Sequence, residues 1–442
     1  MLKTLTSLAT LLAAASLVNL ANSSMTTVMP LRMLEDGASG TMVALFGAVF
    51  FLGFALGCFT QPPLIQRIGY IRAFAAAAGL CTVLAVVMDL SDSIALWLAL
   101  RFFMGVSIAA IFAAVDGWIN GTATDAMRGK VFATYGWCMG ASAVLSQMLL
   151  VRFDGMTVGF LTVLALSFNV GLVLVAMTGS VAPSTQAAGR EGGRGLVFTS
   201  AISVAVAVYA GMVTTAILST LPAILAGSGL DEAHIGAALS AFFLGRLLLQ
   251  IPLGIIADRM DLRLLVAIIA GLTGAIAAAG AVLVMWDAVP FSPAAGQGGR
   301  IPFLAVMLVA GGLVLPLYTL ANSLAFARAN GRPAVRIATS LLLVNSVGAV
   351  VGPLLVALVI PLLGSRALAA VILAASALMT ALAFMAWRRG ASETTSTSLT
   401  AVPATSLAST VSVAEAKYSA PPEAEPGHPA PAAPRKDIGV PD

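Results

Sequence analysis

Ionisable side chains inside long apolar segments are the residues of this sequence whose chemistry most needs an explanation. His234 stands at the start of one such segment, and Arg246 follows twelve residues later. In a helix, this spacing would place Arg246 about 18 Å inward, close to the centre of a bilayer. A charge at that depth is costly unless it is paired or faces a water-filled cavity. Gln250 follows one turn later on the same face, and the two side chains could bind a carboxylate or another anion. In the alternative, Arg246 bonds backbone carbonyls and joins helices.

Two further ionisable residues, Arg101 and Asp116, lie in the apolar segment that begins at Ile94. Arg101 is seven residues from that start, near enough to an edge for its side chain to reach the headgroups, which favours a structural role over a role in transport. Asp116 lies toward the other edge, where Trp118 could mark the interface. If Asp116 is buried, its neutral form is favoured and it becomes a candidate proton carrier; if it reaches the headgroups, it only orders the following loop.

Uncharged polar side chains recur in the same apolar segments. Each taken alone is typical of a hydrogen bond between membrane helices. As a set they suit a polar central cavity that binds a substrate. The members of this set are Asn19, Asn22, Tyr135, Gln147, Tyr209, Tyr318, Asn322 and Asn345.

The composition shows what kind of element must position these residues. Hydrophobic residues make up 59% of the chain and charged residues only 10%, against about 25% charged residues in soluble domains. The apolar residues fall into blocks of the length that a membrane-spanning helix needs. We therefore predict an all-α polytopic membrane protein, with kinks at Pro252, Pro316 and Pro353. The twelve predicted spans are 5–29, 42–64, 73–90, 94–119, 131–151, 156–176, 197–226, 235–257, 264–285, 301–325, 337–360 and 367–387.

The blocks divide into two groups of six. Residues 1–177 form the first predicted bundle and residues 196–389 the second, and the small, polar stretch 178–195 between them has the composition of a flexible linker. Residues 390–442 are rich in Ser, Thr, Ala, Pro and Glu, which predicts a disordered tail. Most of the 23 lysines and arginines fall in the tail and in loops on one side, so we expect both termini, the linker and the tail in the cytoplasm.

Several classes of function are disfavoured by what the sequence lacks. Cys58, Cys81 and Cys138 lie in apolar blocks without the spacing of a metal site or a disulfide framework, and the only histidines are His234 and His428. We therefore expect no metal, no cofactor and no intramembrane catalytic site. The sequence has no Gly-x-x-x-x-Gly-Lys-Ser/Thr loop, which argues against an ATP-driven pump. Its net charge of +4 is too weak a signal to predict nucleic-acid binding.

A polar loop follows the block that ends at Ala257. Its residues Gly254, Asp258, Arg259 and Arg263 resemble the signature of the major facilitator superfamily, Gly-x-x-x-Asp-Arg/Lys-x-Gly-Arg-Arg/Lys, although Asp261 stands where the pattern has glycine. In such a loop glycine permits close helix approach, and the carboxylate can cap a helix and pair with arginine. The resemblance implies that the cluster acts as a conformational gate.

The first half carries weaker versions of the family's patterns. Arg67, Gly69 and Arg72 keep the end of the signature after the second block, while its aspartate is replaced. In the fourth block, Arg101 and Gly105 are similar to the family's Arg-x-x-x-Gly-x-x-x-Ala stripe. With residues 116–120 and 128–129, they resemble the poorly characterised bacterial YcaD-like branch, near the drug exporters.

The resemblance implies secondary active transport by alternating access, in which two six-helix halves rock about a central site. It implies a monomer in the bacterial inner membrane whose partners are a small-molecule substrate, protons and lipid, with no covalent chemistry on the substrate. An organic anion is one candidate substrate, because Arg101 and Arg246 outnumber Asp116 in the spans. Efflux of amphipathic drugs is the alternative, and a sensor that keeps a transporter scaffold and signals through its tail is a third reading.

Overall fold

A computed structural model of the chain describes residues 2–122, 125–153, 159–178, 198–285, 296–328 and 334–390. Almost all of the predicted linker and tail, at 179–195 and 391–442, lies outside the described residues, as do Met156 and Val197, the predicted first residues of two spans. Regular secondary structure in the described part is entirely helical. This confirms the predicted all-α class, because a chain in lipid must satisfy its backbone hydrogen bonds within each segment.

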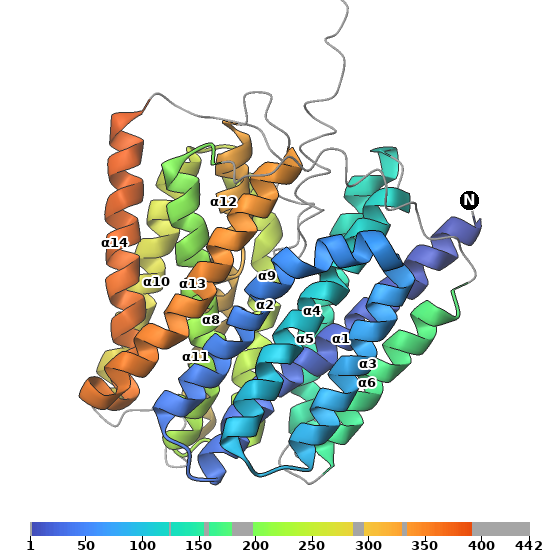
Figure 1. Cartoon of the computed structure of the whole chain (residues 1–442). Coiled ribbons are helices and arrows are strands. Elements are labelled where there is room, and N and C mark those ends of the chain that lie inside the picture. Colours follow the sequence, from blue (N-terminus) through green and yellow to red (C-terminus); the bar gives the residue numbers. More distant parts are fainter. Residues whose placement is uncertain are drawn as a thin grey trace, which may run out of the picture.

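Six long helices form the first half of the chain (Figure 1). Gly69, whose φ is +87°, makes the tight turn between the second and third of them. The helices are α1 (Leu2–Glu35), α2 (Gly40–Ile68), α3 (Tyr70–Asp89), α4 (Ile94–Thr122), α5 (Asp125–Phe153) and α6 (Phe160–Ala176).

In the described part of the second half, the helix is broken at Pro316, where the sequence predicts only a kink. Pro316 has no backbone N–H to continue the helical ladder, and the predicted span 301–325 is divided there into two helices. Pro252 and Pro353 lie inside continuous helices. The elements are α8 (Ala201–Gly227), α9 (Glu232–Ala257), α10 (Leu262–Met285), α11 (Gly296–Val314), α12 (Leu317–Phe326), α13 (Ala334–Leu363), the short 3₁₀ helix η2 (Gly364–Arg366) and α14 (Ala367–Arg389).

The helices have the length and composition of membrane spans. Within the described residues, nine helical segments are long and apolar enough to cross a membrane. The protein is therefore a multi-pass membrane protein. Every predicted span overlaps at least one helix, while the total of twelve spans and the cytoplasmic position of the termini stay predictions.

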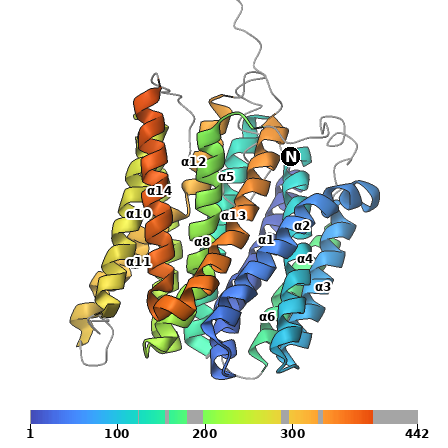
Figure 2. The ribbon, with the colours of Figure 1, turned by 60° about the vertical axis from the view of Figure 1, so that its left-hand side comes forward.

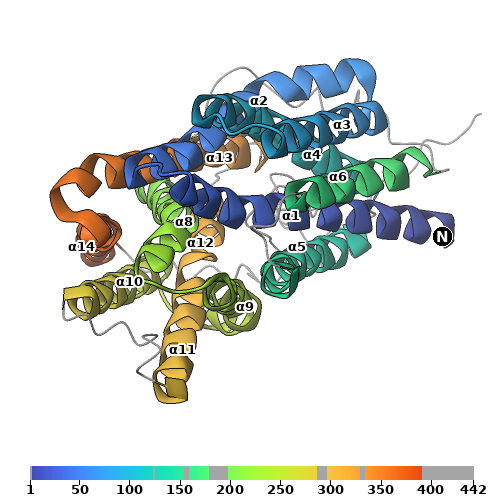
Figure 3. The same cartoon turned by 90° about the horizontal axis from the view of Figure 1, so that it is seen from below.

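Two large buried clusters form the interior. One is built from residues between Leu8 and Val175 together with Ala223, and the other from residues between Ile202 and Ala383. The two groups of helices lie side by side when the molecule is seen along their axes (Figure 3). Helices α2 and α13 run next to each other between them (Figures 1 and 2), and α5 packs against α9. The arrangement agrees with two bundles, although the domain limits themselves remain predictions.

Glycines allow the helices around the centre to touch through their backbones. A Cβ on Gly105 of α4 would overlap the Phe50 carbonyl of α2, and one on Gly53 of α2 would overlap the Phe102 carbonyl of α4. Small residues at such crossings are how membrane helices pack closely, since lipid gives no hydrophobic driving force between them. This contact brings Arg101, four residues before Gly105, against α2.

Candidate functional site

A cavity of about 240 Å³ lies where the two halves meet. Its wall is built from α1, α2, α4 and α5 of the first half and from α8, α9, α12 and α13 of the second. No aspartate or glutamate is among the described residues that line it. The polar side chains of its wall are Asn19, Asn22, Ser23, Thr26, Thr27, Arg101, Thr214, Thr215, Ser219, Arg246, Tyr318 and Asn345.

Arg246 of α9 lines this cavity and is only 9% exposed. Among the described residues its guanidinium has no carboxylate or hydrogen-bonding partner. A buried charge is normally paired, because burial removes the water that stabilises it. The positive charge of Arg246 is thus available to a ligand in the cavity.

Arg101 of α4 also lines the cavity and is 2% exposed. It donates hydrogen bonds to Thr26 Oγ1 at 2.8 Å and to Met104 Sδ at 3.3 Å. Its guanidinium carbon lies 4.2 Å from the ring centroid of Phe50 and 5.2 Å from that of Phe46, a cation–π geometry that stabilises a buried positive charge. Arg101 therefore does not reach toward the headgroups, because the protein itself surrounds its charge.

Four of the predicted neutral residues, Asn19, Asn22, Tyr318 and Asn345, lie in the cavity wall. The Asn19 amide nitrogen donates to the Met139 carbonyl and to Ser142 Oγ, both at 2.9 Å. The side-chain oxygen of Asn22 and the hydroxyl of Tyr318 are buried without a hydrogen-bond partner. A polar ligand could satisfy these two atoms and also the Nε of Arg101, which lacks a hydrogen-bond partner as well.

The other predicted cavity residues are not in its wall. Gln147 accepts a hydrogen bond from Thr27 Oγ1 at 3.0 Å, the Tyr209 and Ser376 hydroxyls are 2.7 Å apart, and the Asn322 amide donates to the Tyr318 carbonyl at 2.9 Å. These side chains and that of Tyr135 are buried, whereas Gln250 is half-buried beside the cavity wall rather than in it. Gln147 and Tyr209 thus join helices.

Asp116 of α4 is 3% exposed and does not line the cavity. Its carboxylate interacts electrostatically with the phenols of Tyr135, in the same half, and Tyr318, in the other half. Trp118 is also buried, so it does not mark a membrane interface. The sequence allowed Asp116 either to be buried or to reach the headgroups, and in the structure it is buried.

The residues of the predicted gate lie near two loops. Gly254 is buried in α9, Asp258 follows that helix as its exposed C-cap, and Arg259 is exposed. In the first half, Arg67 and Arg72 are exposed on either side of Gly69.

Asp261, which stands where the family signature has glycine, forms an ion pair with Arg263, the last residue of the signature. Both oxygens of Asp261 bind the Arg263 side chain, at 3.1 and 2.8 Å, and Arg263 also donates to the Ala386 carbonyl of α14 at 3.3 Å. Burial on its own would raise the pKa of Asp261, but its hydrogen bonds and ion pair with Arg263 outweigh that effect and hold the pKa below its ordinary value. An aspartate just before a helix is typical of an N-cap, which was the available sequence signal.

The aromatic part of the cavity wall was not predicted from the sequence. Phenylalanines from both halves line it beside the arginines: Phe50, Phe51, Phe54, Phe112 and Phe243. Nothing in the apolar pattern distinguishes a phenylalanine that faces a cavity from one that faces lipid, because both are compatible with a membrane helix.

A small apolar cluster joins the halves at the end where α1 ends and α9 begins. Leu31 of α1 packs there with Leu225, Leu230, Ile235 and Leu239 of the second half. We name these five residues the leucine cluster. It lies at the end of the helices opposite the Asp258 loop, since α9 runs from one to the other.

Comparisons with known proteins agree with this architecture. Residues 11–224 match the family model described as Major Facilitator Superfamily. The chain is 23% identical to the uncharacterised MFS-type transporter YcaD of Salmonella enteritidis PT4, over 78% of this chain and 86% of that protein. Its identity with YcaD of Salmonella paratyphi B is 24%, with the same coverage.

Solved structures of transporters share the fold at low sequence identity. A bacterial homologue of the human lysosomal transporter Spinster, in an inward-facing, unoccupied conformation, has a TM-score of 0.67 at 13% identity and covers 87% of this chain and 97% of its own. The nucleoside transporter NupG has a TM-score of 0.67 at 9% identity, and the match covers 87% of this chain and 100% of NupG. A D-xylose–proton symporter has a TM-score of 0.64 at 12% identity, and the match covers 84% of this chain and 96% of the symporter. The match to the family model over residues 11–224, the YcaD relatives and the shared fold all make this chain similar to members of the major facilitator superfamily.

Proposed function

We propose that this protein is a secondary transporter that carries a small organic anion through the membrane by alternating access. The observation that carries the proposal is the buried guanidinium of Arg246, which faces the central cavity without a partner among the described residues. A second guanidinium, that of Arg101, lies in the same wall, and no described carboxylate lines the cavity. An anion that enters would supply the charge that the site lacks.

The substrate class rests on these residues and not on the structural neighbours. Two of those neighbours are named for nucleosides and D-xylose, and likeness at such low identity concerns the fold alone. In this chain, Asn22 and Tyr318 would complete the site, because each has a buried polar atom without a hydrogen-bond partner. Ligand pockets commonly combine apolar walls with a few convergent polar groups.

We further propose that Asp116 couples transport to protons. A carboxyl that is 3% exposed is less costly to bury when neutral, so its protonation can be linked to a change of conformation. The charge of Asp116 also acts on the phenol of Tyr318, a residue of the cavity wall in the other half. The proposed setting is a monomer in the bacterial inner membrane, with twelve spans and cytoplasmic termini.

Efflux of amphipathic compounds is a second candidate, which the five phenylalanines of the cavity wall favour. Aromatic rings provide apolar area for a flat ligand and can also attract a cation to their faces. The positive charge of Arg246 would attract an organic anion and repel an amphipathic cation. The two functions can therefore be separated at that residue.

The test is ligand-induced thermal stabilisation of the purified protein, screened with organic acids, sugars and cationic drugs. We expect acids to stabilise the wild type, and Arg246→Gln to weaken the binding of the best acid by about 10- to 100-fold, as for the loss of a charge-assisted hydrogen bond. Arg389→Gln, at an exposed position at the end of α14, is the matched control and should bind like the wild type. Acid binding that survives in Arg246→Gln would rule out the anion site, and stabilisation by cationic amphiphiles alone would establish the second candidate.

A further inference from the structure

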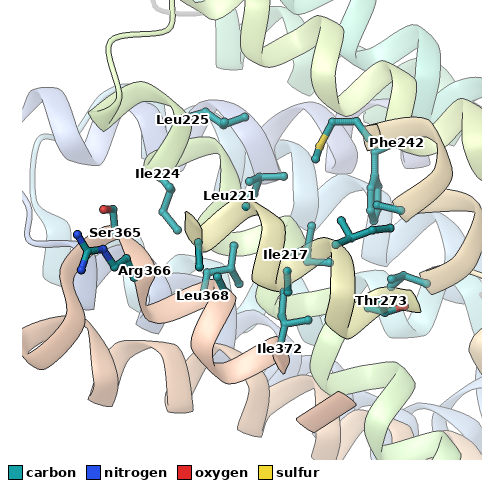
Figure 4. Close-up of a pocket in the computed structure, with 18 of the residues that line it drawn as sticks. Ile217, Leu221, Ile224, Leu225, Phe242, Thr273, Ser365, Arg366, Leu368 and Ile372 are labelled. Atoms are coloured by element: carbon teal, nitrogen blue, oxygen red, sulfur yellow. The ribbon is translucent and has the colours of Figure 1, made fainter. Parts of the chain in front are cut away.

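A second cavity, of about 180 Å³, lies wholly within the second half, between α8, α10, α11 and α14. Its wall is almost entirely apolar, and Figure 4 shows Ile217, Leu221, Leu368 and Ile372 around it. Among the described residues, none lines both this cavity and the central one. Neither the arginines nor Asp116 of the central region take part in it. We call it the lateral slot.

The lateral slot exists because α10 presents small side chains to it, which leave the space between α10 and the neighbouring helices unfilled. Ala277, Gly280 and Ala281 contribute to its wall, facing a space that Phe303 and Met307 of α11 also border. A Cβ added to Gly280 would meet nothing within 4 Å. The wall runs along α10 from Ala281 to Thr273, which at 1.5 Å per residue is a depth of about 12 Å.

An apolar space of this kind is suited to hydrocarbon. Water needs several polar partners to occupy a cavity, and an apolar cavity of similar size is dry and binds small hydrocarbons. The wall follows α10 for about 12 Å, a length that suits part of an extended chain. The interior of the slot therefore indicates an alkyl or acyl chain.

The mouth of the slot is polar, in contrast to its apolar interior. Ser365 and Arg366 of η2 lie at one end of it, and Thr273 and Ile372 toward the other (Figure 4). Arg366 is exposed and, within the described residues, has no hydrogen-bonding or ion-pair partner. A guanidinium beside a hydroxyl is a good partner for a phosphate.

The surroundings of the mouth identify the source of such a molecule. Leu362, just before η2, is 82% exposed, and Ile301 of α11, two residues before the wall residue Phe303, is 73% exposed. In a multi-pass membrane protein, large apolar side chains this exposed at the ends of spans face lipid. The bilayer is thus the first reservoir that the mouth meets, and anionic phospholipids carry both an acyl chain and a phosphate.

We propose that the lateral slot is a binding site for an anionic phospholipid, with one acyl chain between α10 and α11 and the phosphate at Arg366 and Ser365. The chain fills apolar space that would otherwise be empty, and the headgroup charge is complementary to Arg366. The site is separate from the central cavity, so the proposal does not depend on which substrate the protein carries.

The test is photolabelling of the whole protein in lipid nanodiscs that contain phosphatidylglycerol with a diazirine on one acyl chain. Adducts are located by mass spectrometry of peptides. In the wild type we expect them on α10 and α11 at the slot. Gly280→Leu should abolish them by filling the slot, and Arg366→Gln should lower them about fivefold, as for the loss of one arginine near an anionic lipid surface.

Matched controls separate the slot from general lipid contact. Gly79→Leu, where an added Cβ has only an ordinary contact with Leu172, and Arg152→Gln, at an exposed arginine at the end of α5, should label the slot like the wild type. Phosphatidylcholine carrying the same diazirine has a choline that offsets the charge of its phosphate, so it should label the slot more weakly than phosphatidylglycerol and lose less labelling in Arg366→Gln.

Three results would overturn the proposal: unchanged labelling of the slot in Gly280→Leu, equal labelling by phosphatidylcholine and phosphatidylglycerol, or no labelling of the slot in the wild type. A decrease in labelling when millimolar inorganic phosphate is added would support contact between the lipid phosphate and Arg366. If Gly280→Leu does not fold, Ala277→Val reduces the same space, and the Arg366→Gln comparison stands by itself because that residue is exposed.

Discussion

Two arginines keep a charge inside this protein by different means. Arg101 is surrounded by the Thr26 hydroxyl and by the rings of Phe46 and Phe50, so its charge is already stabilised. Arg246 faces the cavity without such partners among the described residues. A ligand gains more from Arg246 than from Arg101, because the binding energy depends on how much the partner was stabilised before.

Asp116→Asn tests proton coupling at the residue scale. An asparagine cannot take up a proton, so we expect this variant to lose uptake driven by a pH gradient in proteoliposomes. Ligand-induced thermal stabilisation should be kept, because Asp116 is not in the cavity wall. Asp36→Asn, at an exposed position, is the control. Full driven uptake in Asp116→Asn would remove this residue from the mechanism.

Asp261→Asn tests the ion pair that fastens the loop before α10 to the end of α14. We expect it to lower the free energy of unfolding by about 1–3 kcal/mol at pH 7, since Arg263 loses its charged partner. Because the pKa of Asp261 is lowered in the folded protein, this contribution is complete above about pH 4 and is lost as the pH falls further. Melting curves of both proteins should therefore converge in acid. A difference that stays constant down to the lowest pH would contradict the ion pair.

At the scale of elements, helix contacts and helix breaks place the site. The backbone contact between α2 and α4 at Gly53 and Gly105 brings Phe50 to Arg101. The break at Pro316 ends α11, and Tyr318, two residues later, lies in the cavity wall. Regular helices alone would not turn these side chains to one centre.

Gly105→Ala tests the α2–α4 contact. A methyl group at this position overlaps the Phe50 carbonyl, and the helices must separate, so we expect a loss of about 1–3 kcal/mol of stability. The thermal midpoint in detergent measures it. Gly79→Ala, with an ordinary contact only, should differ from the wild type by less than about 0.5 kcal/mol. Equal midpoints for the two variants would show that the helices are not held this closely.

At the scale of the whole molecule, the two halves meet along α2 with α13 and α5 with α9. At one end they are also joined by the leucine cluster, which has no charged member. Apolar contacts of this kind can separate without leaving a buried charge unpaired, which would suit a contact that opens and closes in the proposed alternating-access cycle.

Leu31→Asn tests whether the leucine cluster keeps that end closed. Burying an amide there costs about 1–3 kcal/mol, so we expect the open form to become at least about fivefold more populated. The readout is labelling of Thr214→Cys in the cavity by an impermeant thiol reagent, added from the cluster side to a protein without Cys58, Cys81 and Cys138. Leu362→Asn, at a lipid-facing position, should leave labelling unchanged. No increase with Leu31→Asn would show that the cluster does not control access.

The amino-acid sequence by itself determined the helical class, the approximate position of the helices, and the resemblance to the major facilitator superfamily. Apolar segments of this length have few stable conformations in lipid, and the signature loop is a local pattern. It also pointed to Arg246, because a charge in the middle of such a segment is visible without any tertiary information.

Only the tertiary structure decided which polar residues share the cavity. Asn22 and Tyr318 line it while Gln147 and Tyr209 bond neighbouring helices, a difference that depends on how each helix is rotated against its neighbours. The Thr26 hydroxyl that Arg101 binds is 75 residues away in the chain, and the Ala386 carbonyl that Arg263 binds is 123 residues away. The lateral slot likewise depends on the spacing of α10 and α11. Such features arise from contacts between distant segments, and no local pattern of residue types specifies them.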